Sequence, residues 1–215
     1  MARMSHADPN GNPHLTATYA HIERTRGAVS NVLKSFSHAP EGLERFAALG
    51  EYVRYRNELP ARARELAILT IARGIQYAWT HHVTPALKAG VTQEELDAYN
   101  SGIVPATLSL SERAAITFAG EFANGGQVSA ANFDEARKHY SERQVTDLIL
   151  LCGYFIALGY SVNSVQVDLE PDRTPLMKPA GAPPLESRPP CDWRTRNEAP
   201  SRMHHVRFRC HVRIY

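Results

Sequence analysis

The side chains best suited to proton chemistry gather in one stretch of the sequence, residues 59–90. Five of them stand within it: Glu65, Tyr77, Trp79, His81 and His82. A histidine can give or take a proton near neutral pH because its ordinary pKa is about 6.5. A glutamate in an otherwise apolar helix needs a partner, because burial alone would raise its pKa. These residue types together point to general acid–base catalysis.

His82 is the first candidate for the proton carrier, and the alternative is a core histidine that is hydrogen-bonded to a backbone carbonyl. Neighbouring residues of a helix point about 100° apart, so His81 and His82 cannot face one pocket equally. We expect His81 at the edge of the pocket or at a subunit interface. Glu65 would orient His82 or tune its charge, and the alternative is an ordinary salt bridge with a nearby arginine.

Aromatic and polar side chains could complete a binding site around this pair. Tyr77 and Trp79 are suited to line a pocket for a flat ring, but packing in the core is at least as strong an interpretation for Trp79. Tyr154 and Asn163 are polar residues in a long apolar segment, where a buried polar group must be paired. They either join helices or face the site, and we favour Asn163 as a substrate-binding residue.

Apolar residues recur at helical spacing along most of the chain, and no segment shows the alternation of a strand. The stretch 59–90 divides into two helices at Gly74, with Gly90 as the C-cap of the second. The other expected helices cover residues 17–36, 40–56, 92–100, 111–123, 129–140 and 141–167, with Ser111, Ser129 and Ser141 as N-caps of the last three. The pattern therefore predicts an all-α bundle of about eight helices.

Composition and length favour one folded domain with additions at both ends. The chain has 215 residues, 43% of them apolar, and no apolar run of the length that a membrane span needs. The first 15 residues lack the apolar segment of a secretory signal, and three scattered cysteines fit a reducing compartment. We therefore predict a cytoplasmic protein without a membrane partner, with a flexible arm at 1–14 and a helical domain at 15–171.

The remaining segment, 172–215, differs from the rest in charge and periodicity. It contains nine Lys and Arg against four Asp and Glu, together with many prolines and no periodic apolar face. Such a segment is typically disordered, so we predict a tail whose removal leaves the domain intact, and we do not expect a nucleic-acid partner. Its cysteines and histidines match no zinc spacing, and no metal site is predicted. These residues are Cys191, His204, His205, Cys210 and His211.

Three short patterns resemble the carboxymuconolactone decarboxylase and alkylhydroperoxidase-like family. They are Arg64-Glu65-Leu66, Tyr77-x-Trp79-x-x-His82 and Ala86-x-x-Ala89-Gly90-Val91-Thr92-x-x-Glu95. The resemblance covers roughly residues 15–170. It implies the all-α fold of that family and a symmetric homo-oligomer, a trimer or a hexamer. Aligned on His82, the chain has Ile75 and Ala78 where the peroxidase branch has its cysteine pair. Ala78 also replaces the glutamate of the branch that carries a Tyr-Glu-Trp motif.

The resemblance implies a cofactor-free enzyme that decarboxylates a small cyclic or aromatic-derived acid or lactone. Loss of carbon dioxide from such a lactone acid leaves a dienolate, which needs an oxyanion donor and an acid that protonates carbon. We expect His82 to be the acid, Glu65 its partner and Tyr77 the oxyanion donor. The expected substrate-binding residues are Trp79, His81, Arg62, Arg64 and Asn163, with either arginine as the carboxylate anchor.

Two other functions remain open. A thiol peroxidase is disfavoured because Cys152 is the only cysteine of the predicted domain and has no second cysteine to resolve an oxidised thiol. A non-catalytic oligomeric binding protein on the same fold is favoured by Ala78, which removes a carboxylate from the motif.

Overall fold

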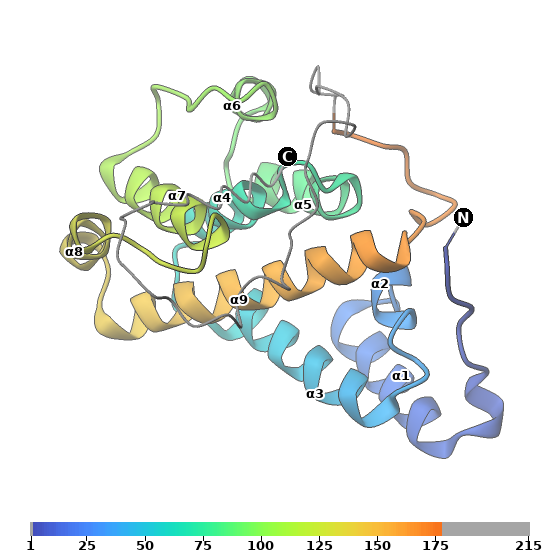
Figure 1. Ribbon diagram of the computed structural model, residues 1–215. Coiled ribbons are helices and arrows are strands. Elements are labelled where there is room, and N and C mark those ends of the chain that lie inside the picture. The colour runs from blue at the N-terminus through green and yellow to red at the C-terminus, as the bar shows by residue number, and fades with distance from the viewer. Residues whose placement is uncertain (1, 178–215) are drawn as a thin grey trace, which may run out of the picture.

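Nine α-helices and two shorter helical turns build the computed structural model, which describes residues 2–177 (Figure 1). The helices are α1 (Pro13–Arg26), α2 (Asn31–Lys34), α3 (Pro40–Glu51), α4 (Ala61–Ala72), α5 (Gln76–Lys88), α6 (Gln93–Asn100), α7 (Leu110–Ala123), α8 (Ala130–His139) and α9 (Glu142–Val165). The turns are the 3₁₀ turn η1 (Pro9–Gly11) and the π-helical turn η2 (Tyr52–Arg56). The described residues contain no strand, so the prediction of an all-α bundle is confirmed.

Helix α9 runs through the middle of the molecule, with α4 to α7 on one side and α1 to α3 on the other (Figure 1). Its side chains Leu148, Leu151 and Cys152 are fully buried. The helix is long and apolar enough to cross a membrane, but more than half of its apolar window is buried inside the protein. That burial is the pattern of a core helix in a soluble bundle. Ile149, Leu150 and Tyr160 face outward, and the predicted homo-oligomer stays a prediction.

The predicted hairpin forms from α4 and α5. Eight of the twelve residues of α4 are buried, Glu65 among them, so this helix lies in the centre of the core. The chain reverses at Gly74, whose φ of 83° is left-handed and readily adopted only by glycine. The C-cap of α5 is Ala89, one position before the predicted Gly90, which follows it at φ 93°. The hairpin brings the middle of α5 against the middle of α4.

Two helix boundaries differ from the predicted ones. The helix expected over 17–36 is split, because Gly27 takes a left-handed φ of 83° and its N–H caps α1 at the Glu23 carbonyl. Helix α7 is capped by Ser109 instead of Ser111. Ser109 and Glu112 form a reciprocal capping box, and that spacing outweighs the closer serine. Ser129 and Ser141 cap α8 and α9 as predicted.

The helix expected over 40–56 also changes character before its end. It is α-helical to Glu51 and continues as η2, a single π-helical turn. A π-helical turn inserts one extra residue into the register, so the side chains after it point in new directions. This turn carries Arg54, which proves to face the pocket described below.

Both end segments of the described chain are attached to the bundle. The Ala2 N–H donates to Asp168 at 2.9 Å, the Arg3 N–H donates to the Val165 carbonyl at 2.8 Å, and α1 already begins at Pro13. These contacts tie residues expected to form a free arm to the end of α9. The boundary of 1–14 as a separate arm stays a prediction.

We call residues 166–177 the C-terminal strap, because they cross back over α5 after α9 ends. The Leu176 N–H donates to the Thr80 hydroxyl at 3.1 Å. Residue 176 of the predicted tail therefore contacts the domain, and the tail boundary at residue 172 stays a prediction. The rest of the predicted tail, including its cysteines and histidines, lies outside the described residues.

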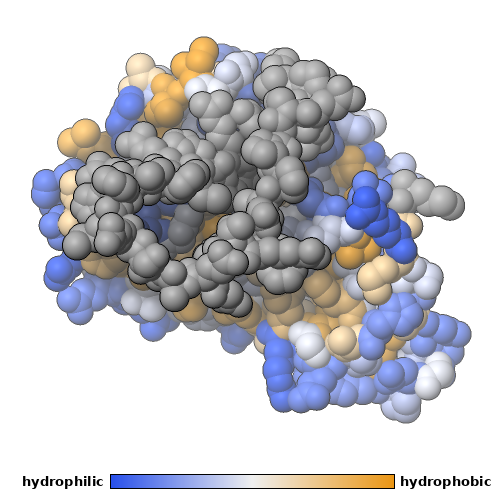
Figure 2. Space-filling view, in the orientation of Figure 1, coloured by the Kyte–Doolittle hydropathy of each residue, from blue (hydrophilic) through white to orange (hydrophobic). Residues whose placement is uncertain are grey.

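The surface seen in Figure 2 is uneven in polarity. Hydrophilic residues dominate around α1, at the lower right of the view. An apolar group lies at the upper edge near α6, where the connection to α7 exposes Ile103, Val104 and Leu110. These residues lie on a different part of the chain from those that line the pocket.

Candidate active site

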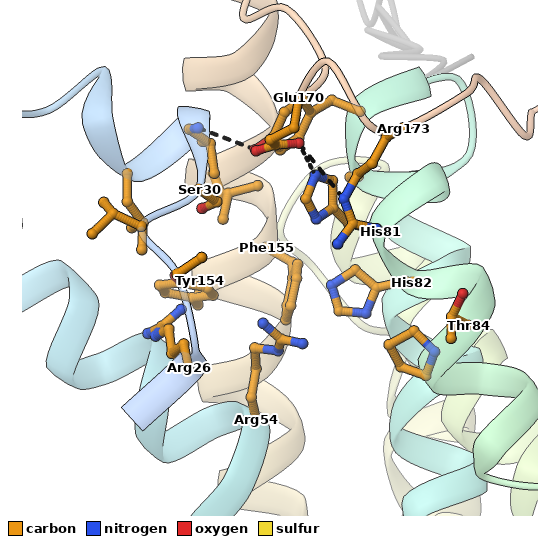
Figure 3. Close-up of a pocket in the computed structure, with 18 of the residues that line it drawn as sticks. Arg26, Ser30, Arg54, His81, His82, Thr84, Tyr154, Phe155, Glu170 and Arg173 are labelled. Atoms are coloured by element: carbon orange, nitrogen blue, oxygen red, sulfur yellow. Dashed lines mark hydrogen bonds and ion pairs between the residues drawn. The ribbon is translucent and has the colours of Figure 1, made fainter. Parts of the chain in front are cut away.

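A pocket of about 520 Å³ opens between α2, η2, α5, α9 and the C-terminal strap (Figure 3). Helix α5 supplies its longest wall, and the strap supplies Glu170, Asp172 and Arg173 at its rim. Phe155 and Leu158 of α9 form the apolar part of the wall. The pocket is large enough for a small ring compound, and its walls combine apolar and charged groups as ligand sites do.

His82 lies at the wall of this pocket and is hydrogen-bonded to Glu65 behind it. His82 Nδ1 is 2.9 Å from Glu65 Oε2, and the two side chains are each only 6% exposed. The Phe155 ring meets the His82 ring edge-on, with 4.9 Å between centroids. An ionised carboxylate only accepts hydrogen bonds, so Nδ1 carries the proton and Nε2 keeps its lone pair. The structure thus brings together the two residues that the sequence singled out first.

Burial decides the charge states of this pair. It lowers the pKa of His82 and outweighs the hydrogen bond that His82 donates to Glu65, which acts in the opposite direction. Burial raises the pKa of Glu65, but the hydrogen bond to His82 and the charges of His82 and Arg64 lower it further than burial raises it. Near neutral pH the pair is therefore a carboxylate and a neutral imidazole, which is the form of a general base.

His81 points to a second glutamate, Glu170 of the C-terminal strap. His81 Nε2 is 2.7 Å from Glu170 Oε2, and the Tyr77 hydroxyl donates to Glu170 Oε1 at 2.7 Å. The Tyr77 and His81 rings are stacked, with centroids 4.4 Å apart. Burial raises the pKa of Glu170, but hydrogen bonds from His81, the Asn31 N–H and Tyr77 bring it down to about 2. His81 therefore lines the pocket beside Glu170, and its expected role in substrate binding stays a prediction.

Tyr77 lines the pocket, but its hydroxyl is already engaged. The hydroxyl gives its proton to Glu170 and accepts a hydrogen bond from the Val32 N–H at 3.2 Å. Burial, reinforced by Glu170, raises the pKa of Tyr77 well above its ordinary value. The geometry therefore does not leave a free donor for a substrate oxyanion at this position.

Trp79 and Asn163 lie away from the pocket. Trp79 is 2% exposed and packs in a separate apolar cluster with Leu66, Val83 and Tyr99. It follows Ala78, which lines the pocket, and one helical step turns Trp79 about 100° away from Ala78. Asn163 is exposed on α9, whereas Tyr154, the other polar residue considered there, lines the pocket.

Both arginines expected to hold a substrate carboxylate have other partners. Arg62 binds Glu95 at 2.7 Å and Glu112 at 2.6 Å, and also donates to the Gly90 carbonyl. Arg64 lies 3.4 Å from Glu65 and supports its negative charge from outside the pocket. Neither side chain lines the pocket, so the anchor must be sought elsewhere.

Most pocket residues lie outside the predicted site, and three charged ones bear on the chemistry: Arg26, Arg54 and Glu170. Arg26 ends α1, and only the position of Gly27 could have shown that its helix stops there. Arg54 depends on the π-helical turn, which has no sequence signature. Glu170 follows α9 in a segment without periodicity, and its place is set by contacts over 89 and 93 residues of sequence.

Residues 2–177 contain no group of three or more His, Cys, Asp or Glu that could hold a metal ion. The expectation of a cofactor-free reaction stays a prediction. Cys152 is buried on the inner face of α9 and does not line the pocket, and burial raises the pKa of its thiol to about 12. At neutral pH it carries almost no thiolate, the reactive form of cysteine.

Several solved structures share this fold. The debrominase Bmp8 in complex with 2,3,4-tribromopyrrole is 16% identical with a TM-score of 0.65, over 80% of this chain and 95% of that one. An alkylhydroperoxidase AhpD core protein from Ralstonia eutropha JMP134 is 16% identical with a TM-score of 0.68, over 79% and 93%. A peroxidase-related protein from Silicibacter sp. TM1040 is 17% identical with a TM-score of 0.65, over 79% and 92%. At these identities the likeness shows the fold.

No curated protein sequence matches this chain. Residues 40–121 match the carboxymuconolactone decarboxylase family, and this range runs from α3 into α7. It contains both members of the buried pair, Glu65 and His82, and the π-helical turn. The family match over residues 40–121 and the shared all-α fold both support the resemblance to the carboxymuconolactone decarboxylase and alkylhydroperoxidase-like family.

Proposed function

We propose that the protein is a cofactor-free acid–base enzyme that decarboxylates a small cyclic or aromatic-derived acid or lactone. One observation carries the proposal: His82 Nδ1 lies 2.9 Å from the buried Glu65 carboxylate at the wall of a pocket of about 520 Å³. A histidine held in one tautomer by a buried carboxylate is a common arrangement for moving protons to and from a substrate.

The roles of the two residues follow from their charge states. Glu65 holds the proton on Nδ1 and so leaves Nε2 of His82 as the atom that exchanges a proton with the substrate. An anionic substrate in the pocket would favour the protonated imidazole, because an opposite charge nearby raises the pKa of a base. His82 would then deliver this proton to the carbon that loses carbon dioxide and recover one from solvent.

Apolar and cationic walls suit a compound of this class. Phe155 and Leu158 offer contact to a ring, and the guanidinium groups of the pocket offer charge to an oxyanion. The oxyanion role first expected of Tyr77 passes to these cations, because the Tyr77 hydroxyl is bound to Glu170. Bmp8, which shares the fold, was crystallised with a small halogenated ring, which supports a ligand of that size.

Peroxidase chemistry has less support. The described residues hold one free cysteine, Cys152, which is fully buried and outside the pocket. A binding protein without catalysis would keep the pocket, and the experiment below separates it from an enzyme.

The test is turnover of a panel of lactone acids and aromatic acids in deuterium oxide. Product is followed by NMR, which detects both loss of the carboxyl group and deuterium at the carbon that carried it. We expect turnover by the wild type and a loss of about 10²- to 10⁴-fold in His82→Gln, the usual contribution of a general acid–base group. His139→Gln is the matched control, because His139 lies on α8 outside the pocket. Binding of panel compounds without any turnover would favour the binding protein.

A further inference from the structure

The π-helical turn η2 directs Arg54 into the pocket from the side opposite His82 (Figure 3). Its neighbours Tyr55 and Arg56 are largely exposed, and Arg56 forms only a surface ion pair with Glu51 at 3.5 Å. A single π-helical turn costs stability and is often found at functional sites. Here it has one evident geometric result, which is the direction of the Arg54 side chain.

Contacts with α9 hold this turn in place. The Tyr52 hydroxyl donates to the Asp147 carboxylate, which also accepts the Glu58 N–H at 2.9 Å. Asp147 is completely buried, so its hydrogen bonds to Tyr52 and to the Glu58 N–H fix the position of the turn against α9. Arg54 is thus presented from a fixed backbone, as expected for a ligand-binding side chain.

Arg54 has no ion pair among residues 2–177, although it is half-buried. Its guanidinium stands over the Tyr55 ring at 5.0 Å, and its charge acts on Glu65, His82 and Tyr154. Of the charged side chains that line the pocket, the two carboxylates, Glu170 and Asp172, both belong to the strap at the rim. The cations are Arg26, Arg54, Lys88 and Arg173. Glu170 pairs with His81 and Arg173, so Arg26 and Arg54 line the pocket without an ion pair among the described residues.

Two unpaired polar atoms lie on the same side of the pocket. The Tyr154 hydroxyl and Arg26 Nε are buried without a hydrogen-bond partner among the described residues. Gly50 of α3 makes room for them, since a Cβ there would stand 2.2 Å from the Tyr154 hydroxyl and 2.8 Å from the Arg26 guanidinium. A buried polar group without a partner is uncommon, and both atoms belong to side chains that line the pocket.

We propose that Arg54 is the anion-binding residue of this site, with Arg26 and Tyr154 as its supporting wall. It receives an anionic oxygen that stays on the substrate, and it sets that oxygen opposite His82. A carboxylate that departs as carbon dioxide must give up its charge, and a guanidinium bound to it would oppose that step. This assignment rests on the proposed function for the reaction, but the binding itself is measurable without turnover.

Calorimetric titration with 2-furoate and its neutral analogue 2-furamide tests the proposal on the full chain. We expect wild type to bind 2-furoate more tightly than 2-furamide, and Arg54→Gln to weaken 2-furoate by about 10- to 100-fold, as for loss of a hydrogen bond to a charged group. Arg54→Gln should leave 2-furamide unchanged. Arg56→Gln is the matched control, since it removes an arginine of the same turn that faces solvent.

Arg54→Lys is the second variant, to be used if Arg54→Gln does not fold. It keeps the charge but loses the planar fork, so 2-furoate should bind with intermediate affinity. Equal binding of 2-furoate by Arg54→Gln and Arg56→Gln would overturn the proposal. A wild type that binds 2-furamide as tightly as 2-furoate would also overturn it, and so would a wild type that binds neither compound. Binding that depends on Arg54 in a protein that turns over nothing would refute the proposed function and leave the anion site standing.

Discussion

Two adjacent histidines of α5 each bind one glutamate, and the two pairs have different properties. His82 meets Glu65 at 2.9 Å, with both side chains 6% exposed. His81 meets Glu170 at 2.7 Å, with side chains 20% and 18% exposed. Both pairs border the same pocket, but Glu65 belongs to the core helix α4 and Glu170 to the C-terminal strap. Histidine–glutamate contact alone therefore does not identify a catalytic pair.

The difference arises from what surrounds each carboxylate. We call His82 and Glu65 the inner pair, and His81 and Glu170 the outer pair. Burial lowers the pKa of His82, so the inner pair has a neutral imidazole that can take up a proton. Glu170 has a pKa of about 2 because burial is outweighed by hydrogen bonds from His81, the Asn31 N–H and Tyr77. A carboxylate so strongly bound stays ionised and fixed. We infer that the inner pair moves protons and that the outer pair fastens the strap.

Substitution of the two histidines gives the largest contrast. His82→Gln and Glu65→Gln should each lower turnover by about 10²-fold or more, because they remove the proton carrier or its orientation. His81→Gln should lower turnover by only a few-fold, since it faces the strap. Rates for the three variants are compared on whichever panel acid the wild type consumes. Equal losses for His81→Gln and His82→Gln would remove the distinction between the pairs.

The sequence was sufficient to predict the inner pair, because Glu65 and His82 both lie in one helical hairpin with a recognisable family pattern. Helix caps at Ser129 and Ser141 were also predictable, since they depend on neighbouring residues. The outer pair could not be predicted from the sequence, because Glu170 reaches His81 across 89 residues of sequence.

The other site residues that the sequence did not predict correctly also depend on contacts between distant parts of the chain. Arg62 and Arg64 looked suitable for a ligand, but local helix direction does not reveal that glutamates of α6, α7 and α4 bind them first. Arg54 gains its position from a π-helical turn whose Tyr52 is held by Asp147, 95 residues further along the chain. Long-range contacts thus decide which charged residues face the pocket.

Truncation tests the fastening role of the outer pair. A chain that ends at Gln166 loses Glu170 and the hydrogen bond from Leu176 to Thr80. The loss of a few buried hydrogen bonds should cost about 1–3 kcal/mol, which is a fall of several degrees in Tm at this chain length. A chain that ends at Met177 keeps the strap and should melt like the full chain. Equal Tm values for both truncated chains would show that the strap is not fastened.

The pH dependence of stability separates the two pairs. The folded pKa of His82 lies below 6.5, so below pH 6.5 the unfolded chain binds a proton that the folded chain does not. Stability should therefore fall as the pH drops from 6.5 towards the folded pKa, by at most about 1.4 kcal/mol per pH unit. Urea unfolding between pH 7.5 and 5 measures this slope, and His82→Gln should flatten it.

The outer pair should act in a lower window. The folded pKa of Glu170 is about 2 against an ordinary 4.5, so its contribution is complete above pH 4.5 and is lost as the pH falls towards 2. Glu170→Gln should change the pH profile only below 4.5. A change confined to the range above pH 5.5 would mean that the carboxylate is not the strongly bound group described here.

Substitution of Cys152 is expected to have the smallest effect on activity. The thiol is buried with a pKa of about 12, so neither the wild type nor Cys152→Ser should reduce hydroperoxides above the rate without enzyme. A coupled assay with a dithiol reductant measures this directly. Peroxidase activity that disappears in Cys152→Ser would contradict the assignment of chemistry to the histidine pair.

The tautomer and charge of His82 are the central claim, and ¹⁵N NMR of the imidazole rings measures both. At pH 7 the wild type should show His82 neutral, with the proton on Nδ1 and a bare Nε2, and its pKa should lie below 6.5. Glu65→Gln should weaken or reverse this preference for Nδ1, because the acceptor loses its charge. An imidazolium at pH 7, or a proton on Nε2 in the wild type, would contradict the account.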